Sequence, residues 1–378
     1  MNNDLAPTYK RLFGLYWVLW YSTSNNYSIV ESEFKSLLDF YLQSNSLDEF
    51  GSKISSVEHV SNLSTITNNL KTYLESCNAS NTSSLEDSAE FNHSNCNITK
   101  YYSVNDKPIT INYDTELVEN TIHPALAHLE VNKNNIDAQI TFDIYLDSGR
   151  LTLFKNQQLI TSVAQRDYHL LQGKFIMQLL CVMHDKDESD WVGTFHGSTI
   201  SDGTNSILFI GNSGKGKSTL CALLAANGYE LLADDVSPML AKDGHIYHNP
   251  SAISIKEGAF SVLQPLITAF ENLPITVFNK NKGPLRYLPC DHPKKDNYPC
   301  KAIIIVNYEA DAKTNVEPAS IKTILETLIP DSWLSHHPLH AEQFLNWLKT
   351  VHLYQLSYSD TDTVITELST IFNEFKSN

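Results

Sequence analysis

Basic residues are scarce in this sequence. Its 378 residues include 27 Lys and Arg against 43 Asp and Glu, which gives a formal net charge of -16 at neutral pH. Such a surface repels phosphate backbones over most of its area, so the composition excludes nucleic acid as an expected partner. A small phosphate-bearing ligand would need clustered Lys, backbone N–H groups and a divalent cation to reverse the charge locally.

Paired cysteines and long apolar runs are also missing. The six cysteines are scattered without a C-x-x-C pair, which argues against a disulfide framework and favours a reducing compartment. Residues 12–21 follow Lys10 and Arg11 as in a secretory signal, but they are rich in Tyr and Trp and fall short of the ~20 residues that span a bilayer. We therefore expect a cytoplasmic protein with no membrane partner, in which residues 12–21 form a buried strand or helix.

Apolar residues make up 42% of the chain, which is enough for two ordinary cores. We place a domain boundary near residue 165. Residues 1–165 predict a smaller α+β domain of unknown role, and residues 166–378 predict an α/β domain. The expected elements are a helix at 28–50, a polar connection at 77–97, strands at 109–113, 138–146 and 151–154, a helix at 168–182, strands at 191–200 and 206–210, a helix at 219–226, a strand at 229–233 and a last helix at 361–375.

A phosphate-binding loop is the strongest signal in the second half. The pattern G-x-x-x-x-G-K-[ST] is matched in full by Gly211, Asn212, Ser213, Gly214, Lys215, Gly216, Lys217 and Ser218, with Thr219 next in the chain. An apolar strand pattern precedes the loop and a helical pattern follows it, so successive N–H groups can converge on an anion at a helix N-terminus. The pattern predicts that Lys217 reaches the β- and γ-phosphates of ATP and that Ser218 ligates magnesium.

An acidic pair follows at Asp234 and Asp235. About ten helical residues at 1.5 Å each descend ~15 Å from the loop, and about five strand residues at 3.3 Å climb back nearly as far. The pair therefore returns to the level of the phosphates. Adjacent residues of a strand point in opposite directions, so one acid can hold magnesium while the other addresses an acceptor hydroxyl.

Guanine selectivity is not indicated. An N-K-x-D motif needs its Asp, and the two near-misses, at residues 132–135 and 279–282, both lack it. The nucleotide expected here is ATP.

Three runs together resemble one family: Phe195-His196-Gly197, residues 207–220 and residues 228–236. They are similar to the HPr serine kinase/phosphorylase family, and especially to the HPr-kinase-related proteins that accompany peptide-modification clusters. The resemblance extends over residues 166–258, and the family's second signature has its nearest counterpart at Lys256-Glu257-Gly258. It implies a mixed-sheet P-loop kinase domain with the phosphoenolpyruvate-carboxykinase-like fold.

The same resemblance assigns roles to individual residues. It implies that Asp234 is the general base for the acceptor hydroxyl, that Asp235 binds magnesium with Ser218, and that His196 positions the catalytic acid. Lys217 completes the catalytic set, and residues 211–219 bind the nucleotide.

The sequence thus predicts a magnesium- and ATP-dependent kinase that phosphorylates a serine- or threonine-type hydroxyl of a protein, peptide or small molecule. The alternative from another class is a switch or assembly module that binds and hydrolyses ATP and acts through its N-terminal domain. The family resemblance also raises the expectation of a homo-oligomer.

Overall fold

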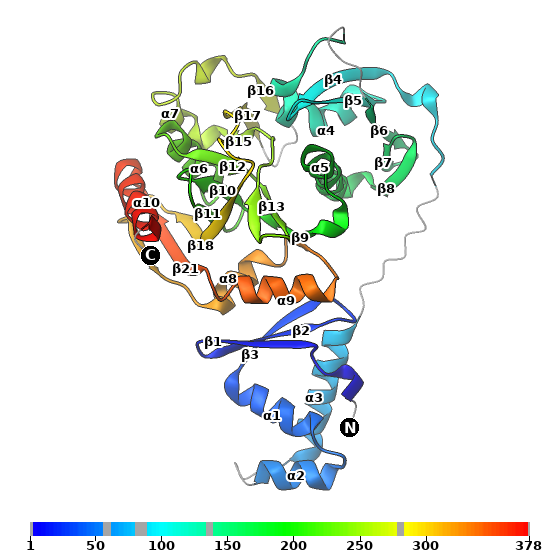
Figure 1. The fold of residues 1–378 in the computed structure, drawn as a ribbon, viewed down its shortest axis with the longest axis vertical. Coiled ribbons are helices and arrows are strands. Elements are labelled where there is room, and N and C mark those ends of the chain that lie inside the picture. The colour runs from blue at the N-terminus through cyan, green and yellow to red at the C-terminus, as the bar shows by residue number, and fades with distance from the viewer. Residues whose placement is uncertain (1–2, 56–61, 80–88, 134–138, 278–282, 377–378) are drawn as a thin grey trace.

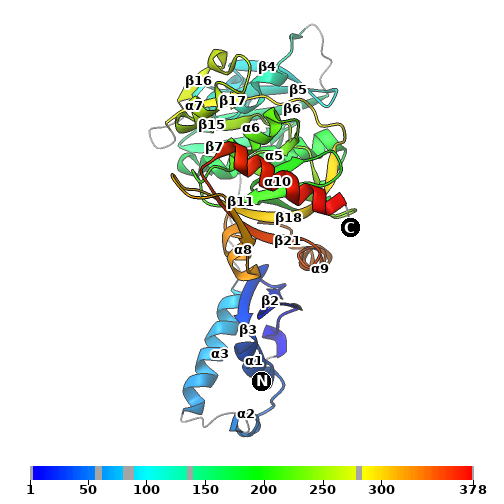
Figure 2. The same ribbon diagram turned by 90° about the vertical axis from the view of Figure 1, so that its left-hand side faces the viewer.

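The protein is described here by a computed structural model that covers residues 3–55, 62–79, 89–133, 139–277 and 283–376. Part of the expected polar connection and both near-misses of the guanine motif fall wholly or partly outside these residues. Three units are visible along the chain, and the first of them projects from the other two (Figures 1 and 2). Within the described residues, no helix combines the length and apolar character needed to cross a bilayer.

The N-terminal unit is a three-stranded antiparallel sheet followed by helices. Its elements are β1 (Tyr9–Phe13), β2 (Tyr16–Tyr21), β3 (Asn26–Glu31), α1 (Ser32–Leu42), α2 (Leu47–Ser55) and α3 (Leu63–Asn78), with β2 in the middle of the sheet. The apolar segment 12–21 therefore forms strands. The single helix expected at 28–50 is wrong, because a short strand and two helices occupy that stretch. One face of β2 packs on the helices of its own unit through Leu19 and Tyr21.

The other face of this small sheet packs on the C-terminal part of the chain. Val18, Trp20 and Tyr27 join a hydrophobic cluster with helices α8 (Ile321–Leu328) and α9 (Pro338–Trp347), which lie directly above the sheet in Figure 1. The Asn25 side chain donates a hydrogen bond of 2.9 Å to the carbonyl of Leu334. The N-terminal unit is thus held against the larger body by apolar burial and by directed polar contacts.

The second unit is a five-stranded sheet covered by two helices. Its elements are β4 (Ile98–Val104), β5 (Lys107–Tyr113), α4 (Glu116–Leu126), β6 (Ile140–Asp147), β7 (Arg150–Lys155), β8 (Gln158–Ala164) and α5 (Tyr168–His184), and the strands lie in sequence order. Neighbouring strands are antiparallel except for β5 and β6, which α4 connects as a parallel pair. The expected hairpin around residues 147–149 and the helix beginning at Tyr168 are confirmed.

Helix α5 packs on this second unit with one face and, through Leu180 and its neighbours, on Trp191 of the third unit with another. Its side chains Leu171, Phe175, Leu179 and Met183 are buried in the same cluster as the inner face of the five-stranded sheet. The boundary near residue 165 passes between β8 and this helix, so the helix contributes to the core on the N-terminal side of that boundary.

The third unit holds the largest sheet, which has mixed parallel and antiparallel pairing, so the α/β class is confirmed at that level. The strands run in the order β12-β10-β11-β18-β14-β13-β9-β20, and β21 and β19 extend from β18. Their bounds are β9 (Trp191–His196), β10 (Ser198–Ser201), β11 (Ser206–Ile210), β12 (Glu230–Ala233), β13 (Val236–Leu240), β14 (His245–Tyr247), β18 (Asn297–Tyr308), β19 (Asn315–Pro318), β20 (Trp333–Leu334) and β21 (His352–Tyr358).

Both faces of this sheet are covered, which explains the continuous apolar run of β11. Ile207 and Phe209 point to a cluster that contains α6 (Lys217–Ala226) and α10 (Thr361–Lys376), while Leu208 and Ile210 point to the cluster of α8 and α9. A smaller sheet of order β15-β17-β16 lies beside α6; its elements are β15 (Ile253–Lys256), α7 (Phe260–Leu263), β16 (Ile275–Val277) and β17 (Pro284–Leu288).

The strand expected at 191–200 is broken at Gly197 into β9 and β10. A Cβ at this position would lie 2.6 Å from the carbonyl oxygen of Phe209 on β11. Only glycine therefore lets the chain at residue 197 approach β11 this closely. Because the carbonyl is backbone, we expect Gly197→Ala to lower the free energy of unfolding by about 1–2 kcal/mol in urea denaturation. Gly173→Ala is the matched control: its Cβ meets nothing within 4 Å in helix α5, and we expect unchanged or higher stability. Equal stability of the two variants would contradict this account.

Candidate functional site

The glycine-rich loop joins β11 to α6, as the motif requires. Gly211, Gly214 and Gly216 have positive φ angles of 140°, 85° and 95°. A Cβ on Gly211 would lie 2.9 Å from the carbonyl oxygen of Val306, and one on Gly216 would lie 2.9 Å from the Tyr358 hydroxyl. Conformation and space therefore both require glycine at these two ends of the loop.

Two tyrosines at the ends of neighbouring parallel strands hold the loop in place. The N–H of Tyr308 on β18 donates to the carbonyl of Lys215 at 3.0 Å, and the Tyr358 hydroxyl on β21 donates to the carbonyl of Gly216 at 3.4 Å. These two bonds engage loop carbonyls from the side of the sheet and fix the loop at the start of α6.

Lys217 is buried, with 7% of its surface exposed. Its ammonium donates to the loop's own carbonyls, at 2.5 Å to Gly211 and 3.4 Å to Asn212. Burial lowers the pKa of Lys217, while the charges of Asp235 and Asp234 act in the opposite direction. The lysine therefore lies within electrostatic reach of both acids.

Asp234 is at the centre of a buried hydrogen-bond network. It is 3% exposed and accepts hydrogen bonds from the Ser198 hydroxyl at 2.6 Å, from the Ser218 hydroxyl at 2.9 Å and from the N–H of Ser254 at 3.1 Å. Burial raises the pKa of Asp234, and the charge of Asp235 raises it further. The network connects the phosphate loop directly to the first acid of the pair.

Asp235 lies in a different environment. Its side chain is 66% exposed, and its Oδ1 lies 3.4 Å from Nδ1 of His196. The backbone has a φ of 67°, and the N–H of Val236 bonds to the carbonyl of Asp234, so Asp235 is the central residue of a γ-turn. A residue other than glycine costs about 1–3 kcal/mol in such a conformation, and this kind of strain is concentrated at functional sites.

The two acids and His196 meet where the chain crosses between two halves of the large sheet. β9 continues into β10 through Gly197, and β12 continues into β13 through the acidic pair. The crossings are adjacent, because His196 pairs with Val236, Thr199 pairs with Ala233, and the N–H of Gly197 bonds to the carbonyl of Asp235 at 3.2 Å. The side chains of Asp234 and Asp235 point in different directions because the two residues form the turn between β12 and β13.

His196 is held from the C-terminal part of the chain. The backbone N–H of His196 donates to the Ser332 hydroxyl at 3.0 Å. Ser332 lies beside the short strand β20, which pairs with β9. The imidazole is 28% exposed and faces Asp235. A polar, partly exposed histidine beside a carboxylate differs from a histidine packed into a core.

The structure brings together every residue proposed for the site from the sequence: the loop 211–219, His196, Asp234 and Asp235. Three further contributors, Ser198, Ser254 and Ser332, were not anticipated in any role, and Lys256 was named only within the nearest counterpart of the family's second signature. Ser198 lies two residues after His196 among other small polar residues such as Thr199 and Ser201, so no pattern distinguished it. Ser254 acts through its backbone, and Ser332 lies far away in the sequence, so neither could be recognised from a pattern.

The donor set fits magnesium rather than a softer metal. Ser218 and the two carboxylates offer oxygen ligands, which Mg²⁺ prefers together with phosphate oxygens and water. Among the described residues, no group of three or more His, Cys, Asp or Glu side chains could hold a metal by itself. A nucleotide-bound magnesium does not need such a cage.

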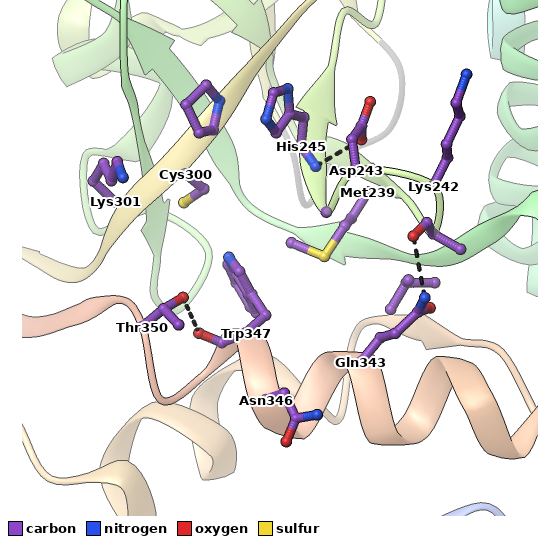
Figure 3. Close-up of a pocket in the computed structure, with 14 residues that line it drawn as sticks. Met239, Lys242, Asp243, His245, Cys300, Lys301, Gln343, Asn346, Trp347 and Thr350 are labelled. Atoms are coloured by element: carbon purple, nitrogen blue, oxygen red, sulfur yellow. Dashed lines mark hydrogen bonds between the residues drawn. The ribbon is translucent and has the colours of Figure 1, made fainter.

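A cavity of about 480 Å³ lies elsewhere, between the β13–β14 turn, the start of β18 and α9 (Figure 3). Met239, Lys242, His245, Lys301 and Trp347 are among its lining residues. None of the lining residues belongs to the phosphate loop or the acidic pair. The cavity is therefore separate from the candidate site.

No family model matches the chain, and no curated protein matches it. Among solved structures, the chain is similar to the HPr(Ser) kinase/phosphatase from Coxiella burnetii, with 11% sequence identity and a TM-score of 0.24. The match covers 48% of this chain and 98% of that chain. It shows a weak structural similarity only.

Proposed function

We propose that this protein is an ATP- and magnesium-dependent kinase of the HPr serine kinase type, which transfers the γ-phosphoryl group to a serine- or threonine-type hydroxyl of a protein, peptide or small molecule. The observation that carries the proposal is the contact between the loop hydroxyl of Ser218 and the carboxylate of Asp234, next to which the exposed Asp235 lies within 3.4 Å of His196. This arrangement joins an anion cradle, a metal position and a carboxylate open to an acceptor.

The contacts favour a division of roles opposite to the one that the family resemblance implies. Asp234 is buried and bonded to Ser218, so it is suited to hold magnesium next to the phosphates. Asp235 faces solvent, where an acceptor can arrive, and His196 lies within reach of its carboxylate. We therefore assign the metal to Asp234 with Ser218, and the acceptor hydroxyl to Asp235.

Each group then has one task in the transfer. The oxygen of the acceptor hydroxyl forms a bond to the γ-phosphorus, the bond from that phosphorus to the bridging oxygen of ADP breaks, and Asp235 accepts the hydroxyl proton. Magnesium, when bound, neutralises charge on the β- and γ-phosphates. Lys217 and the loop N–H groups hold those phosphates in line.

Substitution of Asp235 tests the proposal. Asn tolerates the positive φ at this position, so Asp235→Asn removes the proton acceptor without disturbing the turn. With γ-labelled ATP, magnesium, free serine and serine-containing peptides, we expect transfer by the wild type and about a hundredfold loss in the variant. Binding of magnesium-ATP, measured by calorimetry, should stay within about threefold. Asp147→Asn, at an exposed turn, is the control and should behave like the wild type.

Other outcomes would support a different function. Nucleotide-dependent binding of a partner without labelled acceptor, and without any effect of Asp235→Asn, would indicate the switch or assembly module. Full transfer by Asp235→Asn would rule out the assignment of this residue.

A further inference from the structure

Within the described part of this strongly acidic protein, Lys256 is a lysine without an acidic partner. It lies at the end of β15, its side chain is exposed, and the described residues offer it no ion pair. Its Nζ instead donates to the Ser213 hydroxyl of the phosphate loop at 3.1 Å. A hydroxyl is a weak partner for an ammonium group, so this contact can be exchanged for a stronger one with an anion.

Strand β15 is built to present this side chain. Ile253 and Ile255 are fully buried in the core beside α6, so the alternation of the strand places Ser254 and Lys256 on the opposite face. The N–H of Ser254 is bonded to Asp234, which fixes the strand against the acidic pair. Antiparallel pairing with β17, in the register Lys256 to Leu285, holds its other edge.

The position of Lys256 relative to Lys217 adds an electrostatic argument. The charge of Lys256 contributes to the lowered pKa of Lys217, although burial of Lys217 is the main cause. Two ammonium groups thus face the same loop, one from α6 and one from β15. Like charges repel, so an anion bound near both ammonium groups would relieve their repulsion.

We propose that Lys256 is a catalytic residue that binds the γ-phosphoryl group of ATP from the side opposite to Lys217. The proposal rests on the kinase function proposed above and adds a residue to it. Lys256 leaves Ser213 when the nucleotide arrives and donates N–H bonds to the non-bridging oxygens of the γ-phosphate. No bond to Lys256 forms or breaks during transfer; it stabilises the charge that is spread over those oxygens in the transition state.

The first test is kinetic. We expect Lys256→Met to lower kcat for labelled phosphate transfer by about tenfold or more, with KM for ATP changed by less than about threefold. Lys256→Arg keeps the charge and should recover most of that loss. Lys301→Met is the matched control: Lys301 is exposed in the first half of β18, away from Tyr308 and the phosphate loop, and the variant should retain wild-type kcat. Unchanged kcat in Lys256→Met would overturn the proposal.

The second test does not depend on transfer. Calorimetry with magnesium and either ADP or a non-hydrolysable ATP analogue measures the preference for the γ-phosphate. We expect Lys256→Met to reduce that preference about threefold and leave ADP affinity unchanged, with no change in Tm because the side chain is exposed. An unchanged preference would contradict the role of Lys256 even if no acceptor has been found. If Lys256→Met shows the expected loss of preference but the wild type transfers no phosphate to any acceptor, the kinase function is contradicted and the role of Lys256 in binding the γ-phosphate is not.

Discussion

Asp234→Asn is expected to stabilise the free protein while abolishing its activity. Transfer should fall about a thousandfold, because the variant loses the carboxylate that holds magnesium against the phosphates. Affinity for ATP should no longer increase when magnesium is added. The opposite result, loss of transfer with normal binding of magnesium-ATP, would show that Asp234 is the general base, as the family resemblance implies.

The stability gain follows from the surroundings of Asp234. An Asn can keep the network: its oxygen accepts from the N–H of Ser254, and its amide donates to the hydroxyls of Ser198 and Ser218, which accept as readily as they donate. What disappears is the cost of burying a charge. We therefore expect a higher Tm for Asp234→Asn than for the wild type at pH 7 without ligand.

The pH dependence of this gain has a definite sign. The pKa of Asp234 is raised in the folded state, so its ionised form destabilises the fold at neutral pH. As the pH falls through the raised pKa towards 3.8, the folded wild type takes up a proton and recovers that stability. The difference in Tm between the variant and the wild type should therefore shrink on acidification. A lower Tm of Asp234→Asn at pH 7 would contradict this account.

The sequence was sufficient for those parts of the site that depend on local patterns. The loop between β11 and α6 needs positive φ angles, and only glycine-rich spacing provides them, so the motif and its structure coincide. The helix α5 and the turn at residues 147–149 follow from periodicity and turn chemistry in the same way. Here local preferences and tertiary packing agree.

Features that depend on contacts distant in sequence could not be predicted. The alternating pattern of residues 191–200 reads as one strand, and the break at Gly197 comes from the close approach of Phe209 on another strand. Divergence of Asp234 and Asp235 was expected from strand alternation, whereas the structure has a γ-turn between two sheet halves. Strand β3 was predicted as part of a helix, because its apolar residues continue the spacing of helix α1, which begins directly after it.

A cluster of histidines between the second and third units determines a further expected result. His184 at the end of α5 contacts the carbonyl of His248 through Nε2 at 2.8 Å, and the ring of His248 packs against His292 at 4.6 Å between centroids. His128 belongs to the same group electrostatically. Asp296 lies beyond His292, with 3.4 Å between Oδ1 and Nε2, and Lys107 lies on the side of His184. Of these four histidines, His248 is the one that is buried.

Burial and its histidine neighbours lower the pKa of His248 to about 3. Its Nδ1 is buried and finds no hydrogen-bond partner among the described residues. Partial burial likewise lowers the pKa of His184. The folded protein therefore keeps these rings neutral at pH values where the unfolded chain has already protonated them.

The stability of the protein is expected to fall as the pH drops from 6.5 towards 3. In that window His248 is protonated in the unfolded state and neutral in the folded state. This residue alone therefore lowers the free energy of unfolding by about 1.4 kcal/mol per pH unit. The loss is about 2 kcal/mol at pH 5. Urea denaturation of the wild type and of His248→Gln between pH 7 and 5 measures it, because taking the difference cancels groups common to both. The variant should show the shallower dependence, and parallel curves would mean that His248 is protonated in the folded protein as easily as in the unfolded chain.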